Sequence, residues 1–147
     1  MKSKKKFLSR EEEQQVVQSI KQAERETSGE IRVHIRTQTE ENISTLDMAQ
    51  KAFSQLGIDQ TKDRNGVLFY ISVNQRNLTI LGDKGINKSV PPEFWNEIKE
   101  KVIQKFKEQK YCQGLIEGID TAGQALKKYF PYKKDDINEL PDDISKD

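Results

Sequence analysis

Apolar and polar residues follow one another along this chain with two different periods. Apolar residues three and four positions apart are typical of helices with one buried face, and they predict helices over residues 9–25, 44–56, 92–110 and 115–129. Residues 30–36 alternate strictly, which predicts a half-exposed strand. The nearly unbroken apolar run at 67–73 predicts a strand that is covered on both faces. A turn at 74–76 then returns the chain as an antiparallel strand over 77–82.

The order of these elements predicts the fold class. A helix joins the first strand to the second, and a crossover of this kind within one sheet is right-handed and makes the two strands parallel. The second and third strands form a hairpin, so they are antiparallel. We therefore expect an α/β protein, a three-layer α/β/α sandwich around a mixed, mostly parallel sheet with one antiparallel hairpin.

Length and composition set the expected organisation of the chain. With 147 residues it has the length of one ordinary domain. Residues 7–131 hold the periodic apolar blocks, and we expect them to form a single domain. The basic residues 1–6 and the acidic residues 132–147 offer little that can pack, so they are predicted to be a disordered N-terminus and a disordered tail.

Charge and hydropathy exclude several classes of partner. The formal net charge of +1 lacks the basic excess of a nucleic-acid-binding protein, so we expect no nucleic acid. No apolar run reaches the about 18–20 residues that cross a bilayer, and we expect no membrane insertion. Charged residues at 9–13 stand where a signal peptide has its apolar stretch, which predicts a cytoplasmic location. We expect a monomer that contacts a protein partner.

Three motifs that suggest catalysis are better explained by structure. The segment 82–89 resembles a phosphate-binding loop, but Asn87 stands where the second glycine belongs, and the helix does not open directly after it. His34 lies between two arginines, without a serine nucleophile elbow elsewhere in the sequence. Cys112 is the single cysteine, so it forms no intrachain disulfide, and nothing near it marks an activated thiol.

Acidic and amide side chains are expected to meet at one end of the sheet. The hairpin turn places Asp83 opposite Gly66, beside Asn65 and close to Asp63. Because the first two strands are parallel, Glu30 at the start of the first strand lies at the same end. These oxygens are the ligands that Ca²⁺ or Mg²⁺ prefers, and without a cation the carboxylates of Asp63 and Asp83 repel each other. The alternative is that these acidic loop residues only cap helices or face water.

Several segments resemble a known family in order and spacing. They include Glu-Thr-Ser-Gly-Glu-Ile-Arg-Val at 26–33, Asp-Arg-Asn-Gly-Val-Leu-Phe-Tyr at 63–70, and Ile-Leu-Gly-Asp-Lys-Gly-Ile at 80–86, and their order is more specific than any one of them. Together they resemble the TPM domain over residues 7–131. The resemblance implies an α/β/α sandwich and binding of divalent metal through acidic residues, and the family includes a plant thylakoid member described as an acid phosphatase. Of the acidic positions of the family, those that carry over most directly to this chain are Asp63 and Asp83. Glu30 and Asp120 carry over less directly.

These observations lead to three functional hypotheses. The first is a Ca²⁺- or Mg²⁺-binding TPM-domain module that serves a protein partner in assembly or quality control, with Asp63, Asp83, Asn65 and Glu30 as the metal ligands. The second is a metal-dependent phosphatase in which Asp83 or Asp63 holds the metal and Arg64 steadies the phosphate. The third is an interaction scaffold that uses the lysine-rich helix at 92–110 or the acidic tail. The sequence names no water-activating group, so it leaves open whether the protein is an enzyme.

Overall fold

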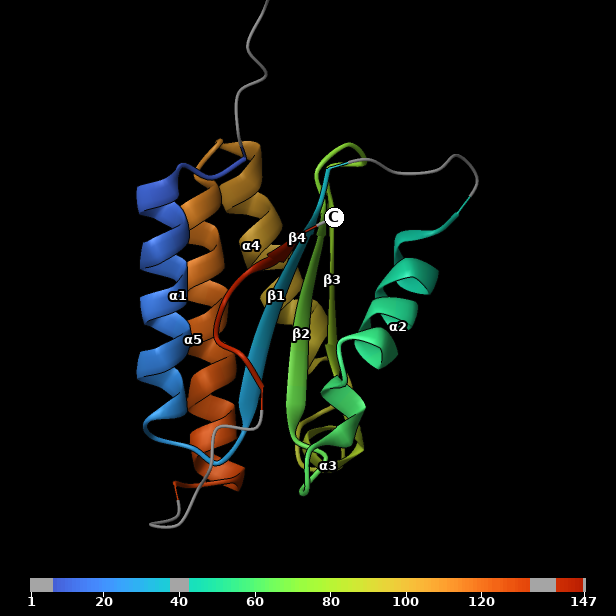
Figure 1. Cartoon of the computed structure of the whole chain (residues 1–147), viewed down its shortest axis with the longest axis vertical. Coiled ribbons are helices and arrows are strands. Elements are labelled where there is room, and N and C mark those ends of the chain that lie inside the picture. The colour runs from blue at the N-terminus through green and yellow to red at the C-terminus, as the bar shows by residue number, and fades with distance from the viewer. Residues whose placement is uncertain (1–6, 38–42, 133–139, 147) are drawn as a thin grey trace, which may run out of the picture.

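The computed structural model describes residues 7–37, 43–132 and 140–146, and in this part of the chain helices cover both faces of one sheet (Figure 1). Three long helices, α1, α4 and α5, lie on one face and α2 lies on the other. The elements are α1 (Arg10–Glu24), β1 (Glu30–Arg36), α2 (Thr45–Gln55), the 3₁₀ helix η1 (Ile58–Gln60), β2 (Gly66–Ser72), β3 (Asn77–Gly82), α3 (Lys84–Asn87), α4 (Phe94–Lys107), α5 (Tyr111–Tyr129) and β4 (Ser145–Lys146). The predicted three-layer α/β/α sandwich is confirmed.

The sheet has the strand order β3-β2-β1-β4. Strand β1 runs parallel to β2, with Glu30 opposite Gly66, and parallel to β4. Strand β2 pairs antiparallel with β3, so that Val67 lies opposite Gly82. The predicted mixed sheet with one antiparallel hairpin is therefore confirmed, and its register fixes which loop residues meet at each end.

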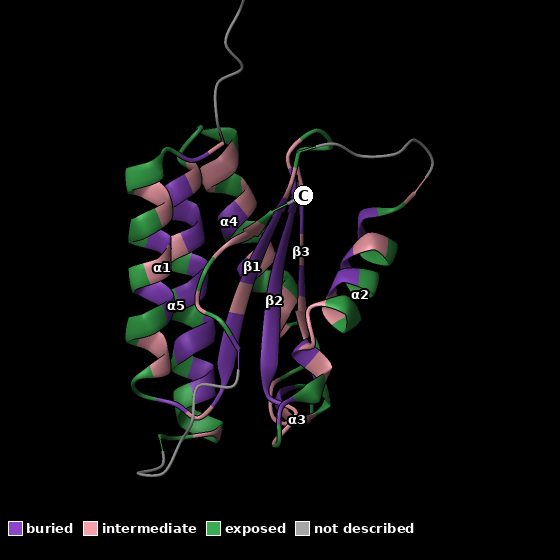
Figure 2. Cartoon of the chain, viewed as in Figure 1, coloured by how far each residue is buried: buried purple, intermediate pink, exposed green. Residues whose placement is uncertain are grey.

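Side chains from the two faces of the sheet form two cores of unequal size. Phe69 and its odd-numbered neighbours on β2 pack against α1, α4 and α5 in the larger core. Leu68 and Tyr70 face the other way, where they pack with Ala49 and Ala52 of α2. Strand β2 is buried along its whole length, as predicted for a strand covered on both faces (Figure 2).

Helix ends and close helix contacts follow from local sequence. Ser9 and Glu12 form the capping box that starts α1, with Glu12 N–H donating to Ser9 Oγ over 3.1 Å. On α5, a Cβ added to Gly118 would stand 2.8 Å from Val102 Cγ2, and one added to Gly123 would stand 3.0 Å from Ala23 Cβ. These glycines let α5 approach α4 and α1 closely, which explains why they are present inside a helix.

The structure differs from the sequence-based prediction at β1. Its residues alternate between the two faces as expected, but the side predicted to be exposed is also covered, so that His34 is only 5% exposed. The His34 ring stacks on Tyr70 at a centroid distance of 5.2 Å, and its Nδ1 lies 2.7 Å from Ser145 Oγ. The outer edge of β1 is covered by the C-terminal segment, which the sequence placed in a disordered tail.

Residues 140–146 correct the predicted tail within the part that the structure describes. Leu140 is buried in the smaller core, and Ile144 packs against the larger one. Between these two anchors the segment crosses the edge of the sheet, and Ser145–Lys146 pair with β1 as β4. The predicted disorder at 1–6, 133–139 and 147 lies outside the described residues. Among the described helices, none is long and apolar enough to cross a membrane.

Candidate metal centre

Two loops meet at the end of the sheet where β2 begins and β3 ends. The Asp83 backbone N–H donates to the Gly66 carbonyl over 2.9 Å, and the Gly85 N–H donates to the Arg64 carbonyl over 2.7 Å. A Cβ added to Gly85 would lie 2.1 Å from the Asp63 carbonyl oxygen, so only glycine permits this approach. The hairpin register therefore brings Asp83 beside Gly66 as the sequence predicts, and it also brings Asp63 to the same point.

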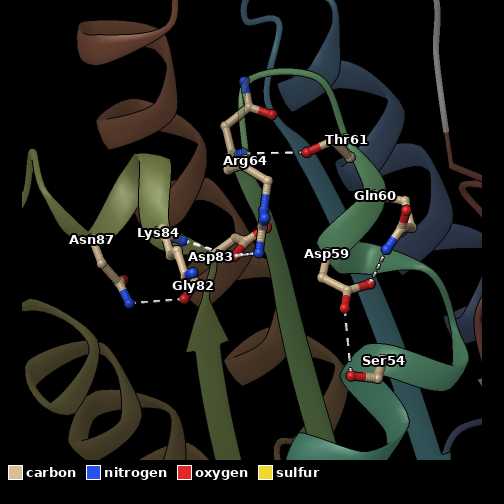
Figure 3. Close-up of polar contacts among 10 residues, drawn as sticks. Ser54, Asp59, Gln60, Thr61, Arg64, Gly82, Asp83, Lys84 and Asn87 are labelled. Atoms are coloured by element: carbon tan, nitrogen blue, oxygen red, sulfur yellow. Dashed lines mark hydrogen bonds and ion pairs between the residues drawn. The ribbon is translucent and has the colours of Figure 1, made fainter.

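The Asp83 carboxylate is the most buried acidic group on these two loops. The residue is 5% exposed, and both of its side-chain oxygens accept hydrogen bonds (Figure 3). Arg64 donates from Nε to Oδ2 over 2.6 Å and from Nη2 to Oδ1 over 3.1 Å. The Lys84 backbone N–H donates to Oδ1 over 2.8 Å, which makes Asp83 the N-cap of α3. The structure thus supplies Asp83 with an internal cation.

Arg64 is held against Asp83 from the solvent side. Its side chain is 41% exposed, whereas the Asp83 side chain is 4% exposed. The hydrogen bond to the carboxylate raises the pKa of the Arg64 guanidinium above its usual value. The Arg64 backbone has a φ of 51°, in the left-handed region. In the phosphatase hypothesis Arg64 steadies the phosphate, but in the structure its guanidinium is bound to the Asp83 carboxylate.

The other predicted ligands are distributed differently. Asp63 is half-buried on the loop that touches Gly85. Asn65 is 2% exposed and its Nδ2 donates to Ser28 Oγ over 3.4 Å, away from Asp83. Glu30 is 3% exposed and lies close enough to Glu24 for their charges to interact.

Asp120, the weaker candidate, lies on neither loop. It is exposed on α5, where its carboxylate accepts a hydrogen bond from Ser19 Oγ of α1 over 3.3 Å. In the described part of the chain, no group of three or more His, Cys, Asp or Glu side chains is arranged to hold a metal ion. Of the predicted ligands, Asp83 is a buried carboxylate whose counter-charge comes from the exposed side chain of Arg64.

Two residues that the sequence analysis did not assign hold the β3–α3 loop in place. Asn87 donates from Nδ2 to the Gly82 carbonyl over 2.8 Å and accepts from Trp95 Nε1 over 2.7 Å. The indole of α4 is thereby tied to the loop that carries Asp83. The hairpin register could have indicated that Arg64 and Asp83 lie near each other, because it places residue 64 opposite the turn into α3.

Cys112 has no sign of a reactive role. Its side chain is buried, and Sγ lies 3.7 Å from the Glu12 carbonyl oxygen that it can donate to. Burial raises the pKa of the Cys112 thiol, and the negative charge of Glu12 raises it further. The thiol therefore stays protonated at neutral pH, in agreement with the packing role expected from the sequence.

The fold and this loop pair define a class of protein, a small α/β/α sandwich with a buried Asp–Arg pair at the amino-terminal end of its parallel strands. The TPM domain model matches residues 1–125, and the chain belongs to the TPM domain family.

The chain is similar to the BA42 protein of the psychrophilic bacterium Bizionia argentinensis, with which it shares 47% sequence identity. Its superposition on the NMR structure of BA42 has a TM-score of 0.90 and covers 100% of both chains. Two more distant NMR structures share the fold. The N-terminal domain of a P. gingivalis protein is 22% identical, with a TM-score of 0.71 over 84% of this chain and 79% of that one. An N-terminal domain from Corynebacterium glutamicum is 12% identical, with a TM-score of 0.56 over 81% and 74%. Comparison with curated proteins gives no match.

Proposed function

We propose that this TPM domain binds a divalent cation, Ca²⁺ or Mg²⁺, with Asp83 as the anchoring ligand and Asp63 as a second one. The observation that carries the proposal is the pairing of the buried Asp83 carboxylate with the exposed guanidinium of Arg64, which a metal ion can replace. Burying the Asp83 carboxylate is unfavourable unless a positive charge lies beside it. The protein uses Arg64 for this purpose, and a metal ion supplies the same charge.

Arg64 can leave Asp83 without disturbing the core. Its guanidinium reaches the carboxylate from solvent, so a change of side-chain rotamer is enough to release both oxygens. The two loops remain joined by the backbone hydrogen bonds of Asp83 and Gly85. Ca²⁺ accepts flexible sets of carboxylate and carbonyl oxygens, and the Asp63 carboxylate and main-chain carbonyls lie on the adjoining loop.

Competition between Arg64 and the metal for the Asp83 carboxylate sets the affinity of the site for the metal. Both need the same two oxygens, so metal binding includes the cost of breaking the ion pair. An ion pair with one exposed partner is a modest contribution to stability, and the bidentate geometry makes this one somewhat stronger. Replacing Arg64 with glutamine removes the competitor, and we expect R64Q to bind Ca²⁺ about three- to tenfold more tightly than the natural chain.

The test is a titration of the ¹⁵N-labelled full chain with CaCl₂ and with MgCl₂, followed by amide chemical shifts. We expect saturable shifts at residues 63–66 and 82–85 that are lost in D83N. D59N is the matched control, because Asp59 lies on the preceding turn and its carboxylate accepts from Ser54 and Gln60, with no bond to Asp83. Unchanged amides at millimolar metal, or a full response in D83N, would overturn the proposal.

We place this cation in a binding module that serves a protein partner in assembly or quality control, as the family resemblance suggests. The phosphatase alternative needs the guanidinium of Arg64 for the phosphate, and in the metal-free protein that guanidinium is engaged by Asp83.

A further inference from the structure

A cavity lies at the opposite end of the sheet from Asp83. It is bordered by the β2–β3 turn and by the turn between α4 and α5, which lie near each other at the top of Figure 1. This is the end where the parallel strands β1 and β2 finish. In open α/β sheets, ligands bind beyond the carboxyl ends of the parallel strands. The position of the cavity alone therefore makes it a candidate ligand site.

One wall of the cavity is an aromatic cluster. Phe7, Phe106 and Tyr111 contact one another, with ring centroids 5.5 Å apart for Phe7–Phe106, 4.6 Å for Phe7–Tyr111 and 5.4 Å for Phe106–Tyr111. All three are half-buried, so each ring keeps part of its surface open to the cavity. The rings come from the start of the described chain and from the two helices, and they provide a rigid apolar surface.

The polar part of the lining is cationic. Arg76 from the hairpin turn and Lys107 from the end of α4 both border the cavity, and its described lining contains no acidic residue. Within the described residues, neither cation forms an ion pair. The whole chain holds 24 acidic and 25 basic residues, so this local excess of positive charge is not a consequence of composition. The remaining polar groups are neutral amides and hydroxyls.

Two residues of this lining adopt a left-handed backbone, one in the β2–β3 turn and one just after the end of α4. In the described part of the chain, the non-glycine residues with positive φ are Arg64, Arg76 and Gln109, at 51°, 51° and 61°. Glycine or asparagine is the usual choice in this conformation, and larger residues are held there at a cost of about 1 kcal/mol. Arg64 belongs to the candidate metal centre, and the other two line this cavity. The chain therefore keeps long polar side chains where the backbone favours glycine.

We propose that this cavity binds a small organic anion, a carboxylate or phosphate carried on an aromatic or aliphatic body. Arg76 and Lys107 contact the anionic group, and the rings of Phe7, Phe106 and Tyr111 contact the body. Arg76 can donate two hydrogen bonds to two oxygens of a carboxylate or phosphate, and Lys107 adds a point charge. The site is separate from the proposed metal centre, so either can exist without the other.

The test uses phenyl phosphate, benzoate and benzyl alcohol as probes, added to the ¹⁵N-labelled full chain. We expect the two anions to shift amides at 72–77 and 106–111 with a Kd of about 1 mM, as suits ligands of this size. Benzyl alcohol, which has the ring without the charge, should bind at least about tenfold more weakly. A preference for phenyl phosphate over benzoate would identify a phosphate site, and the reverse preference would identify a carboxylate site.

Variants locate the binding groups. R76Q and K107Q should each weaken anion binding about three- to tenfold, because each loses one charge-assisted contact. K101Q is the matched control, since Lys101 is exposed on α4 and lies outside the cavity lining. Absence of shifts at about 10 mM probe, equal binding of benzyl alcohol, or shifts confined to other parts of the chain would each overturn the proposal. So would R76Q and K107Q variants that bind phenyl phosphate and benzoate as tightly as K101Q does.

Discussion

At the scale of single residues, Asp83 combines two structural contacts with the proposed ligand role. Its carboxylate caps α3 and neutralises Arg64, while its backbone joins β3 to the loop before β2. From the sequence we expect repulsion between Asp63 and Asp83 in the absence of a cation. The ion pair with Arg64 changes that expectation, because the carboxylate is already compensated.

Asp83→Asn should therefore destabilise the metal-free protein. It removes the ionic partner of Arg64 and weakens the cap, and we expect a loss of about 1–2 kcal/mol in the free energy of unfolding. Denaturation in guanidinium chloride measures this loss against D59N, which changes a half-buried carboxylate that accepts from Ser54 and Gln60 and neither bonds Arg64 nor caps α3. A D83N variant that is more stable than the natural chain would show that repulsion from Asp63 outweighs the pair with Arg64.

At the scale of elements, β1 depends on the end of α1 and on the C-terminal segment to cover its outer edge. The Ile31 N–H donates to Glu24 Oε2 over 2.8 Å, and the Ser145 hydroxyl donates to the Val33 carbonyl over 3.3 Å. Burial, the side-chain hydrogen bond to Asp142 and the nearby charges of Asp142 and Glu30 raise the pKa of Glu24 to about 10. Glu24 is therefore protonated in the folded protein at neutral pH and bonds the segment through Asp142.

This pKa makes the stability depend on pH. Below about pH 4.5 Glu24 is protonated in both the folded and the unfolded state. Between that value and about 10 it is ionised only when unfolded, so stability falls by about 1.4 kcal/mol per pH unit. The natural chain should lose about 3 kcal/mol relative to E24Q between about pH 5 and pH 7, because a glutamine amide at this position keeps the hydrogen bonds without titrating. Urea denaturation of both proteins measures the difference, and parallel pH curves would contradict it.

At the scale of the whole molecule, the two faces of the sheet are protected unequally. Helix α5 packs between α1 and α4 over the larger core, whereas α2 packs on the other face over the smaller one. Regions with few buried apolar contacts open locally at lower free energy than the rest of a domain. The amides of α2 should therefore exchange with solvent at least about tenfold faster than those of α5. Native-state hydrogen exchange measures this ratio, and equal protection would show that the layers open together.

The sequence predicted the fold best where a hydrophobic pattern repeats several times. Strand β1 occupies the predicted residues, and α1 begins within one residue of its predicted start, because both patterns repeat over several turns or pleats. Strand β4 could not be predicted, since Ser145–Lys146 is too short for a period and its position depends on Leu140 and Ile144 reaching two separate cores. For the site, hairpin register predicted the position of Asp83. The register does not fix the pair with Arg64, because it sets the position of the backbone and not the direction of the Arg64 side chain.

The most direct test of the account is the NMR signal of the Arg64 Nε–H group during a Ca²⁺ titration. This group donates to Asp83 Oδ2 over 2.6 Å in the metal-free protein. If a cation replaces Arg64, the signal should lose its hydrogen-bonded shift and exchange faster with water, in step with the Lys84 amide that shares the carboxylate. An Arg64 Nε–H signal that stays unchanged while the chain is saturated with Ca²⁺ would show that the metal binds elsewhere and would contradict the account.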